Sequence, residues 1–397
     1  MRVSFFGVIT IISFLISSCA FRALKTLSNA ELSNNSTSYK IDFNEEYGLA
    51  VIPLTIEGVK YNFVFDTGAQ TTVISSRLSK KIAFDKKGSI STSDAKESSQ
   101  NLIYGTISNI YLDSLHYTNV GVVVNDFSAN PQFSCVDIDG ILGANMINLS
   151  NWEINFIDRY FKIFNIENDL NLSTAYNPIS FNLKRGIPYV EFNINDTTTI
   201  DFMIDSGKNS DIISISNEVD FNIPKLNRSS VGYLGFGMFG NSEIDTTDYY
   251  KTSLSNSNAS FSNVIISQSK ENKSLIGIGF LQKHYNSVLF DFKNNLMYAE
   301  KKQVDNDEYL SDGISPMLLN NETIVIGSKN VNFSPDVDKL NVGDTIVGIN
   351  NVSLENTKSA CELLDEIWRS NKNQESITLK VSRMGKISTF ILPNKNL

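Results

Sequence analysis

The sequence predicts a mainly β protein that contains two copies of one β unit, followed by a smaller α+β unit. Three observations predict this fold class. The chain is rich in Asn, Ser, Ile and Thr, which favours strands and turns over long helices, one pattern of motifs occurs twice in the same order, and the last hundred residues follow a different pattern with one helix. The chain has 397 residues, enough for these parts and a sizeable core.

The N-terminus has the features of an export signal. Arg2 precedes an apolar stretch over residues 5–16 that is too short to span a bilayer, and the following "ISSC" resembles the lipobox of bacterial lipoproteins. We therefore assign residues 1–19 to a lipoprotein signal peptide with Cys19 as the lipidated residue, and residues 20–40 to a linker. The resemblance implies a lipid anchor to a membrane of the bacterial cell envelope, facing the periplasm or the surface. An ordinary signal peptide with an incidental cysteine is the alternative.

The other two cysteines, Cys135 and Cys361, lie far apart in the sequence and in different predicted domains. We expect both to be buried free thiols. Neither a disulfide bond nor a catalytic pair is expected.

Two stretches of the chain repeat one motif. "FVFDTGAQTTVIS" and "FMIDSGKNSDIIS" each consist of an apolar strand that ends in Asp, then Thr or Ser, then Gly, and then a second apolar run. Downstream of each, an apolar-Gly element follows, with Ile141, Leu142 and Gly143 in the first copy and Ile278 and Gly279 in the second. The shared order predicts a duplicated β domain. Its copies cover residues 41–168 and 175–302.

The duplication gives each Asp a partner. A pseudo-twofold axis between the copies would bring Asp66 and Asp205 together, where two carboxylates can share one proton. One of them can then activate water as a general base while the protonated one hydrogen-bonds a substrate carbonyl. Glycines allow the two turns to approach closely, and hydroxyl groups can brace them across the interface. These supporting residues are Thr67, Gly68, Ser206 and Gly207.

With these motifs the chain resembles retropepsin-like aspartic proteases of a bacterial type that carries both lobes in one chain. The resemblance implies duplicated β-barrel lobes in a bilobal aspartic protease fold, catalysis by Asp66 and Asp205, a peptide or protein substrate, and no cofactor or metal. One residue departs from the family pattern, since Lys208 stands where a small residue is usual. Its cation either favours ionised carboxylates and weakens catalysis or points outward.

Other chemical signals are weaker. "GFGMFG", residues 235–240, lacks the helix of a nucleotide-binding loop, so we interpret it and the region near residue 96 as hairpins over a cleft. His116 and His284 are isolated and do not form a metal-binding motif. The net charge of −9 and the absence of a basic cluster argue against nucleic acid as a partner.

The C-terminal part, residues 310–397, resembles PDZ domains of bacterial proteases. It contains a predicted helix over residues 359–370, and the resemblance implies peptide binding by strand addition near residues 311–318. A packing or regulatory module is the equal alternative, because no "GLGF" motif is present. The matching residues are Leu340, Gly343, Asp344, Ile346, Ile349, Asn350, Val381, Arg383, Gly385 and Lys386.

The sequence therefore predicts a lipid-anchored aspartic endopeptidase that uses an Asp66/Asp205 dyad. The alternative is an inactive protease fold that binds peptides or acts as a scaffold through its cleft and its PDZ-like domain. A surface adhesin or assembly factor is a third interpretation.

Overall fold

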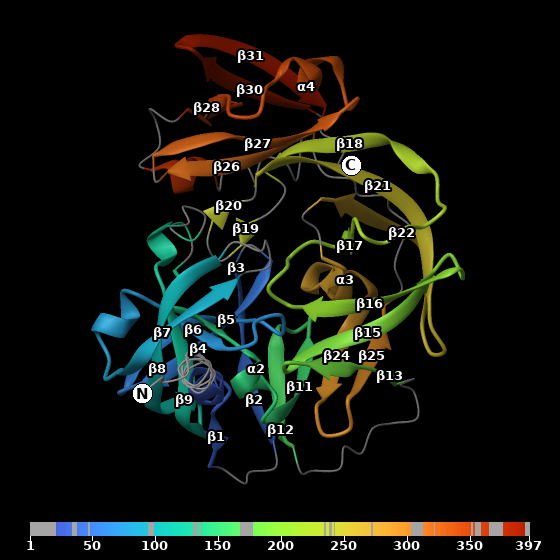
Figure 1. The fold of residues 1–397 in the computed structure, drawn as a ribbon. Coiled ribbons are helices and arrows are strands. Elements are labelled where there is room, and N and C mark those ends of the chain that lie inside the picture. Colours follow the sequence, from blue (N-terminus) through green and yellow to red (C-terminus); the bar gives the residue numbers. More distant parts are fainter. Residues whose placement is uncertain are drawn as a thin grey trace, which may run out of the picture.

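The computed structural model of the chain is built mostly from β-strands (Figure 1). It describes residues 21–33, 38–46, 48–93, 99–129, 133, 135, 137–166, 178–233, 236–237, 240–241, 243–270, 273–302, 313–320, 322–350, 352–353, 359–364 and 376–393. Cys19 and the predicted signal peptide lie outside these residues. Within them, no helix is both long and apolar enough to cross a membrane.

The first β unit contains the strands around the first Asp motif. Their apolar residues alternate along β4 and become continuous at the end of β5, which is buried on both faces. The elements are β1 (Glu31–Leu32), β2 (Ser38–Asp42), β3 (Asn44–Glu46), β4 (Leu49–Ile56), β5 (Val59–Phe65), β6 (Thr72–Ser75), η1 (Leu78–Lys80), β7 (Asp85–Ser93), β8 (Ser99–Leu112), β9 (Leu115–Asn125), η2 (Phe127–Ala129), β10 (Gly140–Leu142), α2 (Ala144–Ile147), β11 (Ser150–Asn155) and β12 (Tyr160–Asn165).

The second β unit repeats this arrangement. In each unit, a short strand that comes after the hairpins in the sequence pairs in parallel with the strand that ends at the Asp motif. In the first unit β10 pairs with β5, and in the second β23 (Leu275–Gly277) pairs with β16 (Thr198–Asp205). The elements are β13 (Ile179–Ser180), β14 (Asn182–Lys184), β15 (Ile187–Ile194), β16 (Thr198–Asp205), β17 (Ile213–Ser216), β18 (Lys225–Tyr233), β19 (Phe236–Gly237), β20 (Gly240–Asn241), β21 (Ile244–Ser255), β22 (Ser260–Ser269), β23 (Leu275–Gly277), α3 (Ile278–His284), β24 (Tyr285–Asp291) and β25 (Leu296–Lys301).

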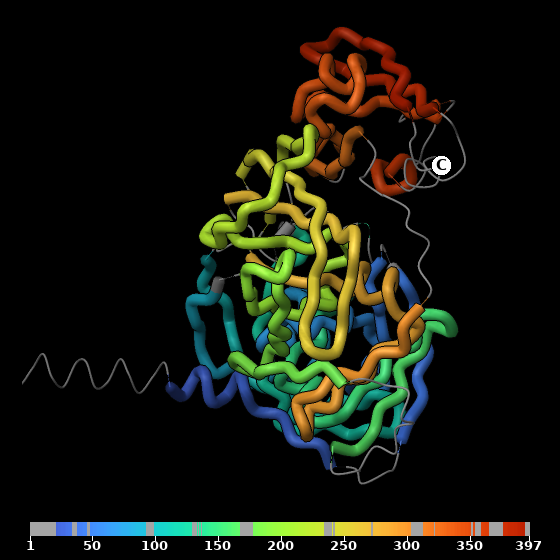
Figure 2. The backbone as a smooth tube through the Cα atoms, turned by 90° about the vertical axis from the view of Figure 1, so that its right-hand side faces the viewer, coloured from blue at the N-terminus to red at the C-terminus, as the bar shows by residue number. Residues whose placement is uncertain are grey.

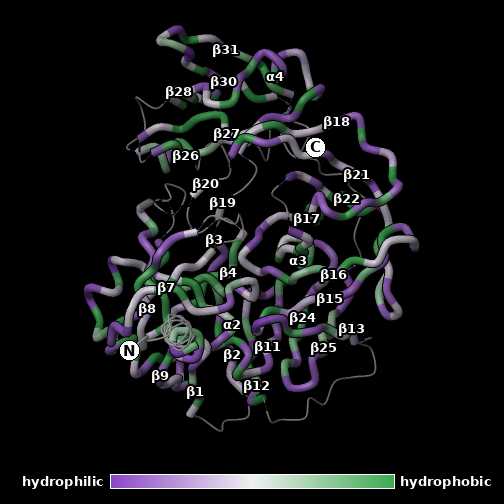
Figure 3. Tube along the Cα trace, in the orientation of Figure 1, coloured by the Kyte–Doolittle hydropathy of each residue, from purple (hydrophilic) through white to green (hydrophobic). Residues whose placement is uncertain are grey.

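A six-stranded sheet joins the two units. Its strands run in the order β13-β25-β24-β11-β12-β2, and the antiparallel pair β11–β24 crosses from one unit to the other. Trp152 on β11 is fully buried beside Phe65 and Phe161, so one apolar core extends across both units. Figure 3 shows apolar residues mainly in these interior strands and hydrophilic residues mainly in the outer turns. This shared core fixes the two Asp loops relative to each other.

The hairpins expected near residues 96 and 235–240 are present as strand pairs. β7 pairs with β8 in the first unit and β18 pairs with β21 in the second. β19 and β20 pair between β18 and β21, and the next element among the described residues is the strand β21 rather than a helix. Residues 94–98, 234–235 and 238–239 lie outside the described residues.

The C-terminal unit has its own apolar core and lies at one end of the molecule in both views (Figures 1 and 2). Ala360, Leu363 and Leu364 are buried on one face of the short helix at residues 360–364, as the sequence predicts, whereas residues 365–370 lie outside the described residues. The strands and the other helix are β26 (Ile314–Asn320), β27 (Thr323–Val331), α4 (Pro335–Lys339), β28 (Thr345–Ile349), β29 (Val352–Ser353), β30 (Ser376–Arg383) and β31 (Lys386–Pro393).

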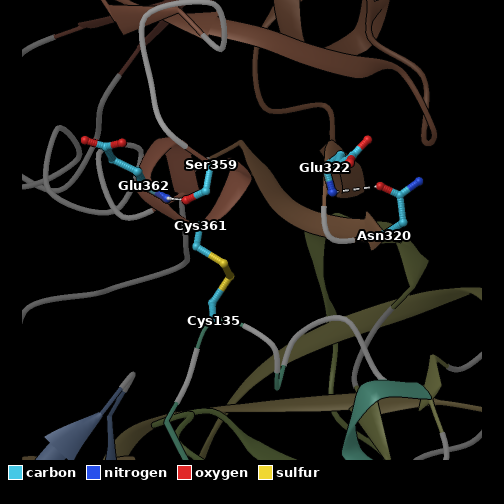
Figure 4. The surroundings of a disulfide bond; sticks show 6 residues. All are labelled: Cys135, Asn320, Glu322, Ser359, Cys361 and Glu362. Carbon is cyan, nitrogen blue, oxygen red and sulfur yellow. Dashed lines mark hydrogen bonds between the residues drawn. A yellow bond between two sulfur atoms is a disulfide. The ribbon is translucent and has the colours of Figure 1, made fainter.

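The expectation that Cys135 and Cys361 are free thiols is wrong. They form a disulfide bond with a Cα–Cα distance of 5.3 Å, although 226 residues separate them (Figure 4). Cys135 belongs to the first unit and Cys361 to the helix of the C-terminal unit. Separation along the chain was a poor guide because the packing of the two units, rather than the length of chain between them, decides which cysteines meet.

Part of the segment expected to be a linker packs on the first unit. Residues 21–27 are helical, and Ala23 and Leu27 are buried in an apolar cluster with residues of β5 and β9. β1 then pairs antiparallel with β9. Gly121 on β9 allows the helix to lie close to this strand, since a Cβ there would lie 2.0 Å from the carbonyl oxygen of Thr26.

Candidate active site

The first Asp motif forms a tight loop at the end of β5. The Asp66 amide donates to the carbonyl oxygen of Leu142 on β10, at 3.1 Å, which continues the strand pairing up to the carboxylate residue. The amides of Gly68 and Ala69 then donate to Asp66 Oδ1, at 2.8 and 3.2 Å. These hydrogen bonds hold one carboxylate oxygen in place.

The second Asp motif forms the equivalent loop at the end of β16. The Gly207 amide donates to Asp205 Oδ1 at 2.9 Å, as Gly68 does to Asp66. Asp205 itself pairs with Gly277 of β23 in the parallel ladder. The two carboxylates are therefore oriented by the same local structure.

Reciprocal hydrogen bonds join the two Asp loops. The Thr67 amide donates to Ser206 Oγ at 2.9 Å, and the Ser206 amide donates to Thr67 Oγ1 at 3.1 Å. Each hydroxyl also donates across the interface, Thr67 to the carbonyl oxygen of Ile204 at 2.8 Å and Ser206 to that of Phe65 at 2.9 Å. Thr67 and Ser206 are both 1% exposed, so these hydrogen bonds satisfy groups that water cannot reach.

These hydrogen bonds bring the two carboxylates together. A Cβ on Gly68 would lie 2.7 Å from Asp205 Cγ, and a Cβ on Gly207 would lie 2.6 Å from Asp66 Oδ2. Each glycine thus lies against the carboxylate of the opposite loop, where any side chain would clash with it. The structure brings together all six residues predicted for this site from the sequence: Asp66, Thr67, Gly68, Asp205, Ser206 and Gly207.

The two carboxyl groups titrate as an interacting pair. Burial, the charge of Asp205 and a hydrogen bond with Asp205 hold the pKa of Asp66 well above its usual range. Burial also raises the pKa of Asp205, but the Lys208 ammonium and hydrogen bonds from Gly207 and Asp66 counteract it. The pair therefore titrates as one unit, in which burial favours a shared proton and the Lys208 ammonium opposes it.

Lys208 lies beside this pair. Its Nζ donates to the carbonyl oxygen of Ile212 at 2.8 Å and to Ser214 Oγ at 2.7 Å, so the side chain folds back over its own loop. The corresponding residue of the first loop is Ala69, which carries no charge. Lys208 therefore makes the electrostatic surroundings of the two carboxylates unequal. The sequence identified Lys208, but its two hydrogen-bond acceptors could not be inferred from the motif.

The alignment of Gly143 with Gly279 is wrong. Gly143 directly precedes α2, whose Ala144 amide donates to the Ala69 carbonyl oxygen; in the second unit Gly277 directly precedes α3, whose Ile278 amide donates to the carbonyl oxygen of Lys208, the residue equivalent to Ala69. A Cβ on Gly277 would lie 2.5 Å from the carbonyl oxygen of Lys208, and one on Gly143 would lie 2.5 Å from the carbonyl carbon of Thr71. The sequence "IGIG" repeats every two residues, so the alignment by pattern alone was off by one repeat.

The histidines lie elsewhere. His116 stacks on Tyr111 and is hydrogen-bonded to Ser33 and Asn109, while His284 packs against Phe280. Burial and the charge of Lys283 lower the pKa of His284 to about 4, so it is neutral near pH 7. Across the described part of the chain, no three His, Cys, Asp or Glu residues form a group able to hold a metal ion.

The comparison with known protein families finds a match that covers the first Asp loop. Residues 52–146 match the family model described as aspartyl protease, a segment that includes β5, Asp66 and Gly143. No curated protein is significantly similar to the chain. The second loop, which carries Asp205, lies beyond the matched segment. Its equivalence to the first therefore depends on the shared strand pairing and the reciprocal hydrogen bonds.

Proposed function

We propose that the chain is an aspartic endopeptidase in which Asp66 and Asp205 form the catalytic dyad. The observation that carries the proposal is the reciprocal arrangement of the two loops, with each glycine against the opposite carboxylate and each hydroxyl bonded across the interface. The match of residues 52–146 to the aspartyl protease family supports it. A bilobal arrangement, with one aspartate from each unit, follows from the proposal.

The proposed reaction starts from a dyad that carries one proton. One of the two aspartates holds this proton and donates a hydrogen bond to the carbonyl oxygen of the scissile peptide bond. The other aspartate accepts a proton from a water molecule, whose oxygen attacks the carbonyl carbon, and the first proton passes to the carbonyl oxygen to give a tetrahedral diol. The second aspartate then gives its proton to the amide nitrogen while the first takes back a proton from a diol hydroxyl, so that the C–N bond breaks and a carboxylic acid and an amine are formed. The reaction needs an extended peptide between the two units, near the β7–β8 and β18–β21 hairpins.

Peptide cleavage by single Asn variants tests this proposal. The chain without residues 1–19 is incubated with a peptide library from acidic to neutral pH, and the products are identified by mass spectrometry. We expect Asp66→Asn and Asp205→Asn to lose nearly all cleavage while remaining folded, and the exposed Asp113→Asn to retain it. Equal cleavage by the wild type and both dyad variants would refute the proposal.

Lys208 favours one alternative function. A cation held beside the dyad stabilises ionised carboxylates, and a dyad without a proton cannot polarise a substrate carbonyl. The alternative is therefore a protease fold that binds peptides without cleaving them. Saturable peptide binding with no product at any pH would favour this function over catalysis.

We also propose export and lipidation at Cys19, with the protein anchored in the bacterial cell envelope. The lipobox-like sequence "ISSC" is the main support. The Cys135–Cys361 disulfide agrees with it, because structural disulfides persist in oxidising compartments such as the periplasm.

For the C-terminal unit we propose a PDZ-like module. The support is its sequence pattern together with the role of Asp344, which accepts hydrogen bonds from Arg383 at 2.6 and 2.7 Å and orients the turn before β28. A peptide would add to the sheet near β26 and the helix at residues 360–364. Binding of extended peptides to a variant lacking dyad activity tests this role separately from cleavage.

A further inference from the structure

The C-terminal unit extends the sheet of the second β unit. β18, the outer strand of the β18–β21 hairpin, pairs antiparallel with β27 from Ser229 opposite Val331 to Gly232 opposite Ser328. The sheet therefore continues without a break from β16, which ends at Asp205, through β23, β17, β22, β21 and β18 to β27. Figure 1 shows β18 lying along β27 at the junction of the two units.

Buried side chains strengthen this pairing. Ser230 Oγ on β18 donates to Asn330 Oδ1 on β27 and is hydrogen-bonded to the Tyr249 hydroxyl, at 2.8 Å. Ser230 and Asn330 are buried, so separating the strands would leave polar groups without these partners. The Arg228 guanidinium also lies over the ring of Phe333, 4.6 Å from its centroid.

Gly232 shows how closely the strands approach. Its φ is +143°, and a Cβ there would lie 2.3 Å from the carbonyl oxygen of Gly327. Every other residue type would therefore push β18 and β27 apart. The junction is a fitted interface and not a loose contact between neighbouring parts.

A second attachment ties the C-terminal unit to the first β unit. Cys361 lies on the helix whose Leu363 packs in the same core as Ile324 and Ile326 of β27. Its partner Cys135 precedes Asp139, which accepts a hydrogen bond from Arg77 of the first unit at 2.8 Å. The C-terminal unit is thus bonded covalently to one β unit and by strand pairing to the other.

We infer that the C-terminal unit is a brace that holds the β18–β21 hairpin in a fixed position relative to the first unit, and that the disulfide maintains the brace. With the bond intact, β27 stays at high effective concentration beside β18. Without it, the strand pairing, the side-chain contacts at the junction and the chain between residues 302 and 313 keep the unit in place. The second part of the inference, which rests on the proposed function, is that the braced hairpin helps to bind an extended peptide substrate.

Hydrogen exchange tests the brace without requiring catalysis. Exchange is measured by mass spectrometry in the chain without residues 1–19 that carries Asp66→Asn, so that self-cleavage cannot interfere. Adding Cys135→Ser and Cys361→Ser should accelerate exchange of the β18 amides about tenfold or more, since the tether no longer raises the effective concentration of β27. Exchange in β9 of the first unit should stay unchanged. Unchanged exchange in β18 would overturn the brace, whether or not the chain cleaves peptides.

Two glycine variants distinguish an effect at the β18–β27 junction from a general loss of stability. Gly232→Ala should accelerate β18 exchange, because the new Cβ meets β27. Gly385→Ala should not, although Gly385 also has a positive φ (+79°), because nothing lies within 4 Å of a Cβ there. In the active chain, Gly232→Ala should raise KM for a long peptide about threefold or more, with kcat nearly unchanged because the dyad is untouched. Accelerated exchange with an unchanged KM would overturn the role of the hairpin in substrate binding.

Discussion

Replacing Thr67 with valine removes the hydrogen bonds that the Thr67 hydroxyl makes between the two Asp loops, without changing the shape of the side chain. In the structure Thr67 Oγ1 donates to the Ile204 carbonyl oxygen at 2.8 Å and accepts from the Ser206 amide at 3.1 Å. Valine can do neither, so both backbone groups stay buried without this partner. An unpaired buried polar group costs about 1–3 kcal/mol, which gives a loss of roughly 2–4 kcal/mol after partial relaxation.

Thermal unfolding measures this loss. For a protein of nearly 400 residues, a loss of that size lowers Tm by roughly 3–5 °C. The control is Thr389→Val, which places the same change on an exposed position of β31 and should shift Tm by about 1 °C or less. Peptide cleavage should fall as well, because the loops that orient both carboxylates lose their cross-link. If Thr67→Val unfolds at the same temperature as the Thr389→Val control, the hydrogen bonds of the Thr67 hydroxyl do not stabilise the interface between the loops.

The remaining predictions concern charge and anchoring. Lys208→Thr should shift both limbs of the pH–activity profile to higher pH, because the ammonium lowers the pKa of Asp205; an unchanged profile would mean that this charge does not reach the dyad. Since the pKa of Asp66 is raised in the folded state, the wild type loses stability as pH rises above the unfolded pKa of about 3.9, whereas Asp66→Asn lacks this loss. Urea titrations should therefore find Asp66→Asn more stable than the wild type near pH 7, with the advantage gone at acidic pH. Cys19→Ala should move the protein from the membrane fraction to the soluble fraction, and continued extraction only by detergent would contradict lipidation.

The site was predictable because its signal is local and occurs twice. Asp66 and Asp205 each end a buried apolar strand, where an unpaired carboxylate would be costly, and this cost indicates a partner. The hydroxyl and glycine that follow each Asp have roles set by the loop itself, so the same three-residue pattern predicts the same structure in both units.

What the sequence could not provide depends on packing between distant segments. The Cys135–Cys361 bond depends on how the C-terminal unit lies against the first unit, and that placement follows from the pairing of β18 with β27. Gly277 was missed because a strand repeats every two residues, so "IGIG" fits the motif in two registers. Likewise, the helix at residues 21–27 is held by contacts with β5 and β9 that a linker-like composition does not reveal.

The central claim is that Asp66 and Asp205 act as one catalytic unit, and kcat/KM for one cleaved peptide tests it most directly. The measurement compares the wild type, Asp66→Asn, Asp205→Asn and the double variant, each shown to be folded. Because either change removes both the shared proton and its acceptor, we predict that each single variant loses nearly all activity and that the double variant is little worse than either. Losses that multiply in the double variant, or a folded single variant that cleaves at nearly the wild-type rate, would contradict the two-carboxylate mechanism.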